Sequence, residues 1–267
     1  VPNYLDASNH HSYVNGNLDW VYINNEAEYV SNENFRLALA YAINRENYNI
    51  LVNNGVYQAW GNIVLPMCEG PEEGTTYGDT VQPEGYPIQG DEAKAKEYLQ
   101  EALTELGISD PSEITIHFTA WDDETTKRVA EVCQEMWQNV LGINVQIDMV
   151  TYGQVYTTIY PNKDYQVGYG GWGPDYADPY TYLYLFYSKN SNNYSNYKNP
   201  EFDALIDQSN EETDTAVRMD LLAEAEALLI EDGANCPLQM RDVHYLLDED
   251  VTGVLFYYIG YNICPVY

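Results

Sequence analysis

The feature that most constrains the fold is a regular alternation of helix and strand patterns in the middle of the chain. Apolar residues recur at helical spacing over residues 91–106 and 123–141, and each run starts at an aspartate and stops at a glycine. Residues 114–120 (ITIHFTA) and 143–148 (INVQID) alternate apolar and polar side chains, which is typical of strands. A helix–strand–helix–strand order at this spacing predicts an α/β layer.

Hydrophobic periodicity also predicts secondary structure over the rest of the chain. It predicts further helices at residues 34–44, 46–53, 152–160, 179–187, 200–209 and 214–232. It predicts further strands at residues 18–24, 165–169, 237–240, 243–247 and 255–259. Residues 1–17 are polar and are predicted to be irregular. Residues 55–90 hold four prolines and no periodicity, so we expect a long loop that is functional or wraps over another surface. The fold class is therefore α/β, with a mixed β-sheet flanked by helices.

The charge of the chain excludes some partners. Forty-two acidic residues against 11 basic ones give a net charge of −31, which would repel a nucleic acid backbone and an anionic membrane surface. Such a charge favours solubility, and a preference for cationic ligands is the alternative. No run approaches the roughly 20 apolar residues of a membrane span. The chain begins without a Met or a signal sequence, so we expect a piece of a longer protein.

The cysteines and histidines show no metal-binding pattern. None of the four cysteines forms a CxxC pair, and the histidines are scattered, so a metal site or a cofactor is not expected. The cysteines stand at positions 68, 133, 236 and 264, which leaves three full pairings open. Cys133 lies on the apolar stripe of a predicted helix and is expected to be a buried thiol. No nucleophile elbow, P-loop or zinc-protease helix is present, so an enzyme is not expected.

One segment combines several groups that suit ligand binding. The strand predicted to end at Tyr169 is followed by a turn with three glycines, Trp172 and Asp175. Glycines let a backbone approach a ligand closely, and Trp172 offers a flat apolar wall with one N–H donor. The carboxylate of Asp175 can pair with an ammonium group. A peptide could use all of these groups, because an extended backbone can also add to a strand edge.

Three segments together resemble the oligopeptide- and dipeptide-binding family of solute-binding proteins of ABC importers. They are residues 36–59 (RLALAYAINRENYNILVNNGVYQA), residues 170–183 (GGWGPDYADPYTYL), and the stretch from YSNYKNPEFDALIDQSN to EAEALLIEDGANCP within residues 194–237. Their order and approximate spacing match the family over about residues 18–255. Each motif alone would be weak, and the match rests on all of them.

The resemblance implies one lobe of a periplasmic-binding-protein-like fold, in which two lobes close over the ligand. Residues 18–247 are expected to form the distal, C-terminal ligand-binding lobe. Residues 1–17 would lead in from the missing N-terminal lobe, and residues 248–267 would return toward it. The implied function is capture of short peptides for a permease in the membrane. The implied location is extracytoplasmic, either periplasmic or as a cell-surface lipoprotein.

The resemblance also implies roles for particular residues. Asp175 would hold the amino terminus of the peptide, and Trp172 would pack near its first residues. Backbone contacts would come from the glycines of the turn, and Tyr22 falls where some members place a pocket-facing side chain. These ligand-binding residues are Gly170, Gly171, Trp172, Gly173, Asp175 and Tyr22. Pro174 departs from the small residue that is common before the aspartate, and it stiffens the turn.

Some of these residues, and the function itself, are open to other interpretations. Asp178 is expected to cap a helix, while Arg36 and Arg45 are expected to pair with structural carboxylates. An oligosaccharide is the best alternative ligand, because Trp172 and the 27 tyrosines of the chain could stack on sugars. A secreted hydrolase is a weaker alternative, since among 42 carboxylates a suitably spaced pair arises by chance. A pure adhesion module has no specific support.

Overall fold

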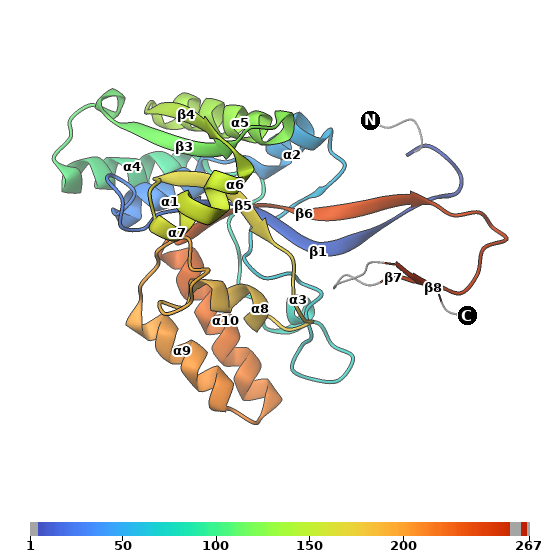
Figure 1. The fold of residues 1–267 in the computed structure, drawn as a ribbon. Coiled ribbons are helices and arrows are strands. Elements are labelled where there is room, and N and C mark those ends of the chain that lie inside the picture. Colours follow the sequence, from blue (N-terminus) through green and yellow to red (C-terminus); the bar gives the residue numbers. More distant parts are fainter. Residues whose placement is uncertain (1–4, 257–262, 266–267) are drawn as a thin grey trace.

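The computed structural model describes residues 5–256 and 263–265 and contains a six-stranded mixed sheet (Figure 1). The strand order is β2-β6-β1-β5-β3-β4, in which β3 runs parallel to β4 and β5, while β1 runs antiparallel to β5 and β6. The strands are β1 (His10–Ile23), β2 (Gln58–Ala59), β3 (Thr115–Trp121), β4 (Asn144–Val150), β5 (Val167–Trp172) and β6 (Asn235–Leu246). A separate two-stranded sheet pairs β7 (Val254–Phe256) antiparallel to β8 (Ile263–Pro265). The predicted α/β class is confirmed.

Helices cover the sheet on both faces. One face packs against α1 (Glu33–Tyr41), α2 (Arg45–Asn53), α4 (Glu92–Leu106) and α5 (Glu124–Leu141). The other face packs against α8 (Tyr180–Leu183), α9 (Pro200–Glu211) and α10 (Thr215–Glu231). The short helices α3 (Tyr77–Thr80), α6 (Tyr152–Gln154) and α7 (Tyr160–Asn162) lie in connections, and a π-helical turn over Val155–Ile159 joins the last two. Covering both faces explains why the central strand β1 is apolar on both sides: Trp20 and Tyr22 face one helical layer, and Val21 and Ile23 face the other.

The predicted helix ends are confirmed in atomic detail. The side chain of Asp91 accepts a hydrogen bond from the Lys94 N–H, and that of Asp123 accepts bonds from two N–H groups of the first turn of α5. Gly107 and Gly142 close these two helices in the left-handed conformation, with φ of 69° and 72°. This conformation favours glycine over other residues, which is why the sequence marks the helix ends clearly.

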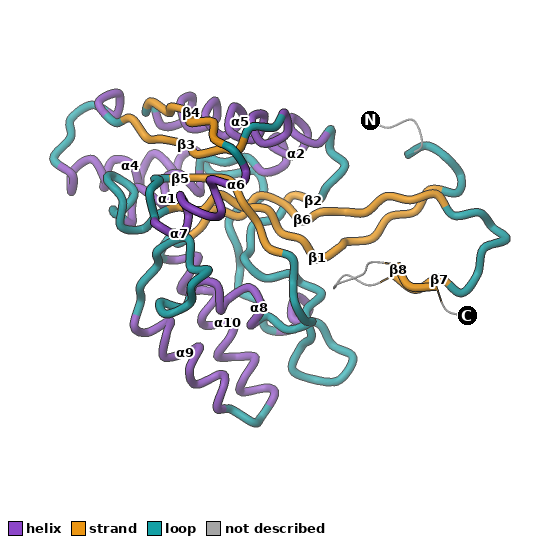
Figure 2. The backbone as a smooth tube through the Cα atoms, viewed as in Figure 1, coloured by secondary structure: helices purple, strands orange, loops and turns teal. Residues whose placement is uncertain are grey.

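Two strands are longer than predicted. Residues 10–17, predicted to be irregular, belong to β1, and the two strands predicted at 237–240 and 243–247 form the single strand β6. These extensions pair with each other from His10 opposite Leu246 inward, and they project from the body as a two-stranded ribbon (Figure 2). The polar composition of residues 10–17 gave no strand pattern, because this segment is held by a strand partner more than 200 positions away in the chain. Of the strand predicted at 255–259, residues 257–259 lie outside the described residues.

The long loop over residues 55–90 wraps over the helical layer that contains α10. Only β2 and α3 are regular within it. Its residues Ile63 and Val64 are buried, and their N–H groups donate to the fully buried carboxylate of Glu226 at 2.9 and 2.8 Å. The hydroxyl of Tyr77 donates to the second oxygen of Glu226 at 2.9 Å. The expectation that this loop covers another surface is confirmed.

The two buried arginines do not bond to carboxylates. Arg45 is fully buried and donates to the carbonyl oxygens of four residues and, at 3.8 Å, to the sulfur of Cys236. Arg36 donates to three backbone carbonyls, including that of Asp232. The prediction that both pair with structural carboxylates is therefore wrong within the described residues. Backbone carbonyls at loop and helix ends need donors, and a guanidinium can satisfy several at once.

The predictions for Asp178 and Cys133 are confirmed. Asp178 accepts a bond from the Tyr180 N–H at 2.9 Å and also pairs with Arg218. Cys133 is a buried free thiol, as are Cys68 and Cys236. Among the described residues, no helix is long and apolar enough to cross a membrane.

Candidate functional site

A strand edge without a strand partner lies at the carboxyl end of β5. The pairing of β5 with β3 covers only Val167 and Gly168, whereas its pairing with β1 continues to Trp172. Residues 170–172 therefore have a strand neighbour on one side only within the described chain. Crevices at the carboxyl ends of parallel strands are common binding positions in α/β sheets, because the chain diverges there.

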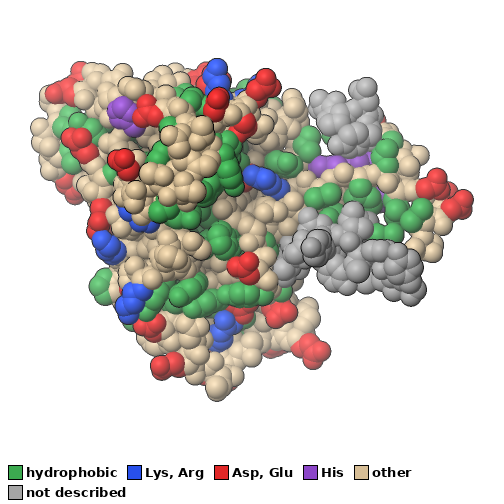
Figure 3. Space-filling view, in the orientation of Figure 1, with side chains coloured by type: hydrophobic (Ala, Val, Ile, Leu, Met, Phe, Trp, Pro, Cys, Tyr) green, Lys and Arg blue, Asp and Glu red, His purple; other side chains and the backbone are tan. Residues whose placement is uncertain are grey.

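A cavity of about 270 Å³ lies against this edge. Its wall is aromatic: Trp121, at the end of β3, has ring centroids 5.4 Å from Tyr152 and 5.2 Å from Tyr169. The ring of Tyr156 lies 4.9 Å from that of Tyr152, so the four rings form one continuous surface. Figure 3 shows hydrophobic side chains gathered on this face of the molecule, around α6 and β5. The cavity can thus receive an apolar or aromatic group beside residues 170–173 of the strand end.

The cavity also contains an ion pair. The guanidinium of Arg241, on β6, donates from Nε and Nη2 to the carboxylate of Asp19 on β1, with a shortest contact of 2.7 Å. Asp19 is 2% exposed, while the Arg241 side chain is 41% exposed. Burial lowers the pKa of Arg241, but the hydrogen bonds and charge of Asp19 outweigh burial, so the pKa is raised overall. The Arg241 guanidinium is therefore charged at physiological pH.

Four of the residues predicted from the turn line this cavity: Gly170, Gly171, Trp172 and Gly173. The first two and Trp172 belong to β5 itself, so the turn predicted to begin at Gly170 begins after Trp172. The Nε1 of Trp172 is shielded from solvent and has no hydrogen-bond partner among residues 5–256 and 263–265. A buried donor without a partner is unusual, and an acceptor from a ligand or a bound water would satisfy it.

Asp175 and Tyr22 lie outside the cavity lining. Asp175 follows the strand, is exposed, and its backbone N–H donates to the Thr181 hydroxyl at 3.1 Å. Its carboxylate has no hydrogen bond or ion pair with the described part of the chain, which leaves it free to meet a cation. Tyr22 is 2% exposed and lies behind Gly170, where a Cβ atom would come within 2.3 Å of the Tyr22 ring. In this lobe the Tyr22 ring packs in the core, and burial raises the pKa of its phenol.

Sequence reasoning missed the other groups of the cavity. Asp19, Trp121, Tyr152, Tyr156 and Arg241 come from four separate segments of the chain. One signal was available: Asp19 is a carboxylate within the apolar run LDWVYIN, and a buried charge needs a partner. The sequence could not have shown which of the 11 basic residues that partner is.

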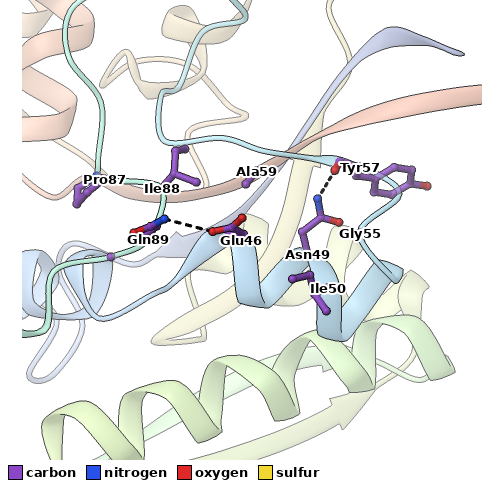
Figure 4. A pocket seen from close by; sticks show the side chains of 10 residues that line it. Glu46, Asn49, Ile50, Gly55, Tyr57, Ala59, Pro87, Ile88 and Gln89 are labelled. Atoms are coloured by element: carbon purple, nitrogen blue, oxygen red, sulfur yellow. Dashed lines mark hydrogen bonds between the residues drawn. The ribbon is translucent and has the colours of Figure 1, made fainter. Parts of the chain in front are cut away.

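A larger cavity, of about 760 Å³, lies between α2 and the loops around residues 55–59 and 87–90 (Figure 4). Figure 4 shows the Asn49 amide pointing to the Tyr57 carbonyl and the Gln89 amide pointing to Glu46 across 3.5 Å. Ile50 is 54% exposed there. The side-chain amide nitrogens of Asn49 and Gln89 bond to neighbouring groups, while the Asn49 side-chain oxygen has no partner within the described residues. We assign the site to the smaller cavity, because the free strand edge, the aromatic wall and the ion pair meet there.

The six-stranded sheet and its helical layers define an α/β fold of the periplasmic-binding-protein-like type. The family model for bacterial extracellular solute-binding proteins, family 5 Middle, matches residues 3–194. The chain therefore belongs to this family of solute-binding proteins.

Individual relatives agree with this assignment. The chain is 34% identical over 252 residues to the oligopeptide-binding protein OppA of Bacillus subtilis. This alignment covers 94% of this chain and 44% of that protein. It superposes with a TM-score of 0.85 and 27% identity on the substrate-binding domain of an oligopeptide ABC transporter from Bacillus anthracis, covering 98% of this chain and 51% of the other. For OppA of Listeria monocytogenes bound to peptide, the TM-score is 0.81 at 25% identity, with 97% and 50% covered. The chain thus spans about half the length of these relatives.

Proposed function

We propose that this chain is one lobe of the solute-binding component of an ABC importer and that it captures short peptides outside the cytoplasm. Its family is that of extracellular solute-binding proteins, and its relatives include oligopeptide-binding proteins. Because the chain spans about half of these relatives, a second lobe would close over the ligand, and a membrane permease would receive it. The full-length protein would be either periplasmic or attached to the cell surface as a lipoprotein.

The observation that carries the proposal is the free edge of β5 beside an aromatic cavity. An extended peptide can add to this edge at residues 170–172 through main-chain hydrogen bonds that do not depend on its side chains. Trp172 would pack against the first residues of the peptide. The free carboxylate of Asp175 would pair with the α-amino group in a charge-assisted hydrogen bond.

The structure leads us to revise two of the roles inferred from the resemblance. Tyr22 would support the site from behind Gly170 rather than contact the ligand. Gly171 leaves room for the carbonyl of Leu18, which a Cβ atom would approach to 2.3 Å, as well as for a ligand. The glycines would therefore serve both packing and binding.

Calorimetric titration of the full-length protein tests this function. A pool of short peptides with free amino termini should bind, and the same pool after N-acetylation should bind at least tenfold more weakly. Asp175→Asn should weaken binding of the free pool by roughly ten- to hundredfold, the range for losing one charge-assisted bond. Asp220→Asn is the matched control, because Asp220 is an exposed carboxylate on α10, away from the cavity. Failure of both pools to bind would refute peptide capture.

The aromatic wall also supports a second candidate ligand. Trp121, Tyr152 and Tyr156 present ring surfaces on which a sugar could stack. A pool of oligosaccharides belongs in the same titration. Binding of sugars without binding of peptides would replace the first proposal while leaving the lobe and its cavity in place.

A further inference from the structure

The Asp19–Arg241 pair leaves part of the guanidinium unused. A guanidinium has five N–H donors, and Asp19 receives bonds from Nε and from Nη2. Nη2 also donates a long hydrogen bond of 3.5 Å to the Tyr169 hydroxyl, and Nη1 has no hydrogen-bond partner among the described residues. A second carboxylate can bridge Nη1 and Nη2 with two parallel bonds, in which the ligand oxygen on Nη2 replaces the long bond to Tyr169.

A chain of buried side chains holds this guanidinium in place. The Gln239 side chain donates to Asp19 at 2.8 Å and accepts a bond from Asn53, at the end of α2, at 2.6 Å. Gln239 and Asp19 are each 2% exposed. Because both oxygens of Asp19 accept bonds, the carboxylate cannot rotate away, and Arg241 is fixed before any ligand arrives. Such preorganisation reduces the entropy lost on binding.

We infer that Arg241 is a specificity-determining residue that binds a carboxylate of the ligand in the cavity at β5. Asp19 and Arg241 are the charged side chains of the cavity lining, and Arg241 alone of the two retains free hydrogen-bonding groups. A neutral acceptor would bond to the same edge more weakly than a carboxylate does. A ligand seated against the aromatic wall would shield this contact from part of the solvent, which would strengthen it further.

This inference rests on the proposed function and adds a second charge requirement to it. Asp175 would select a positive group and Arg241 a negative group on the same peptide. The carboxylate has two sources: the C-terminus of a short peptide or an acidic side chain of a longer one. Both offer the same chemistry to the guanidinium, so peptide design must separate them.

Two matched peptide pairs, titrated calorimetrically into the full-length protein, separate the sources. Ala-Phe-Ala as free acid and as C-terminal amide tests the terminus. Ala-Glu-Ala-amide and Ala-Gln-Ala-amide test the side chain. We expect one pair to differ by roughly ten- to hundredfold in Kd in favour of the acid. If binding needs a free amino terminus but neither pair differs, the role of Arg241 is overturned and peptide capture stands. If none of the peptides binds, both are overturned.

Variants then assign the difference to Arg241. The double variant Asp19→Asn/Arg241→Gln removes both charges together, because removing the arginine alone would leave a buried carboxylate unpaired and endanger folding. It should bind the acid and its neutral partner within about threefold of each other, since the charge-assisted bond is lost. Arg241→Lys keeps the positive charge but lacks the planar guanidinium that makes two parallel bonds, so it should retain only part of the preference for the acid. Arg128→Gln, an exposed base on α5, is the control and should retain the full preference. A preference that survives in the double variant would refute the inference.

Discussion

A substitution at Gly170 can distinguish two explanations for the glycines at the end of β5. The glycines could let a ligand approach the backbone, or they could make room for neighbouring side chains of the protein itself. The backbone of Gly170 is not in the left-handed region, so alanine is allowed there by its backbone conformation. A Cβ atom at this position would nevertheless lie 2.3 Å from Cε2 and 2.8 Å from Cδ2 of Tyr22. The Tyr22 ring cannot easily move away, because Trp20, Tyr160 and Tyr194 surround it with ring centroids 5.5–5.7 Å distant.

We therefore expect Gly170→Ala to destabilise the protein even without ligand. A normal carbon–carbon contact is about 3.5–4.0 Å, so the ring must shift by about 1 Å or more within a packed cluster. Overpacking of this kind costs about 1–3 kcal/mol in the free energy of unfolding. Urea denaturation followed by far-UV circular dichroism measures the loss, and a thermal melt should fall by roughly 2–4 °C for each kcal/mol.

Gly153→Ala is the matched control. Gly153 lies in α6, is exposed, and has no atom within 4 Å of the Cβ that alanine would add. It should be neutral or stabilising by up to about 1 kcal/mol. Tyr22→Leu removes the clashing ring atoms, so Gly170→Ala should cost much less in that background. If Gly170→Ala were as stable as Gly153→Ala, Gly170 would have no packing role and ligand approach would be the better explanation.

Two further predictions concern buried ionisable groups. Burial raises the pKa of Glu226 from 4.5 to about 7, against the hydrogen bonds that lower it. The folded state therefore binds the Glu226 proton more tightly than the unfolded state does. This difference stabilises the fold fully below pH 4.5, and the stabilisation is lost as the pH rises through about 7. Glu226→Gln should remove this pH dependence. The free energy of unfolding of the variant, measured in urea relative to wild type, should therefore rise by up to about 3 kcal/mol from pH 5 to pH 8. An equal difference at both pH values would contradict this. Arg45→Lys should cost about 3 kcal/mol, because lysine cannot reach four carbonyls at once. Arg128→Lys on the surface is its control, and equal stability of the two variants would contradict the role of Arg45.

Local patterns predicted the helices well because their ends are encoded in neighbouring residues. Asp91, Asp123, Gly107 and Gly142 act through bonds and backbone angles within their own turns. The strands over residues 10–17 and 235–246 were predicted less well. Their polar outer parts are held by each other across the sheet, and that pairing leaves no local pattern in either segment.

The candidate site was predicted only where it is continuous in the chain. Gly170, Gly171, Trp172 and Gly173 could be found because they are adjacent and line one cavity. The sequence could not show that Tyr22 packs behind Gly170, because whether a residue of a buried strand faces a cavity or a core depends on what covers each face of the sheet. The arginines show the same limit: composition suggested carboxylate partners, and the fold supplied backbone carbonyls to Arg36 and Arg45 instead.

The sequence by itself determined the α/β class, the helix boundaries, the family resemblance and the glycine–tryptophan segment, because each depends on residues close together in the chain. Only the tertiary structure decided that β5 extends past β3 and that Asp19 and Arg241, 222 positions apart, share one cavity. It also decided that Tyr22 is packed behind Gly170. Contacts of this kind form when distant strands align in a sheet, and their energy is gained only after the chain has closed the loops between them.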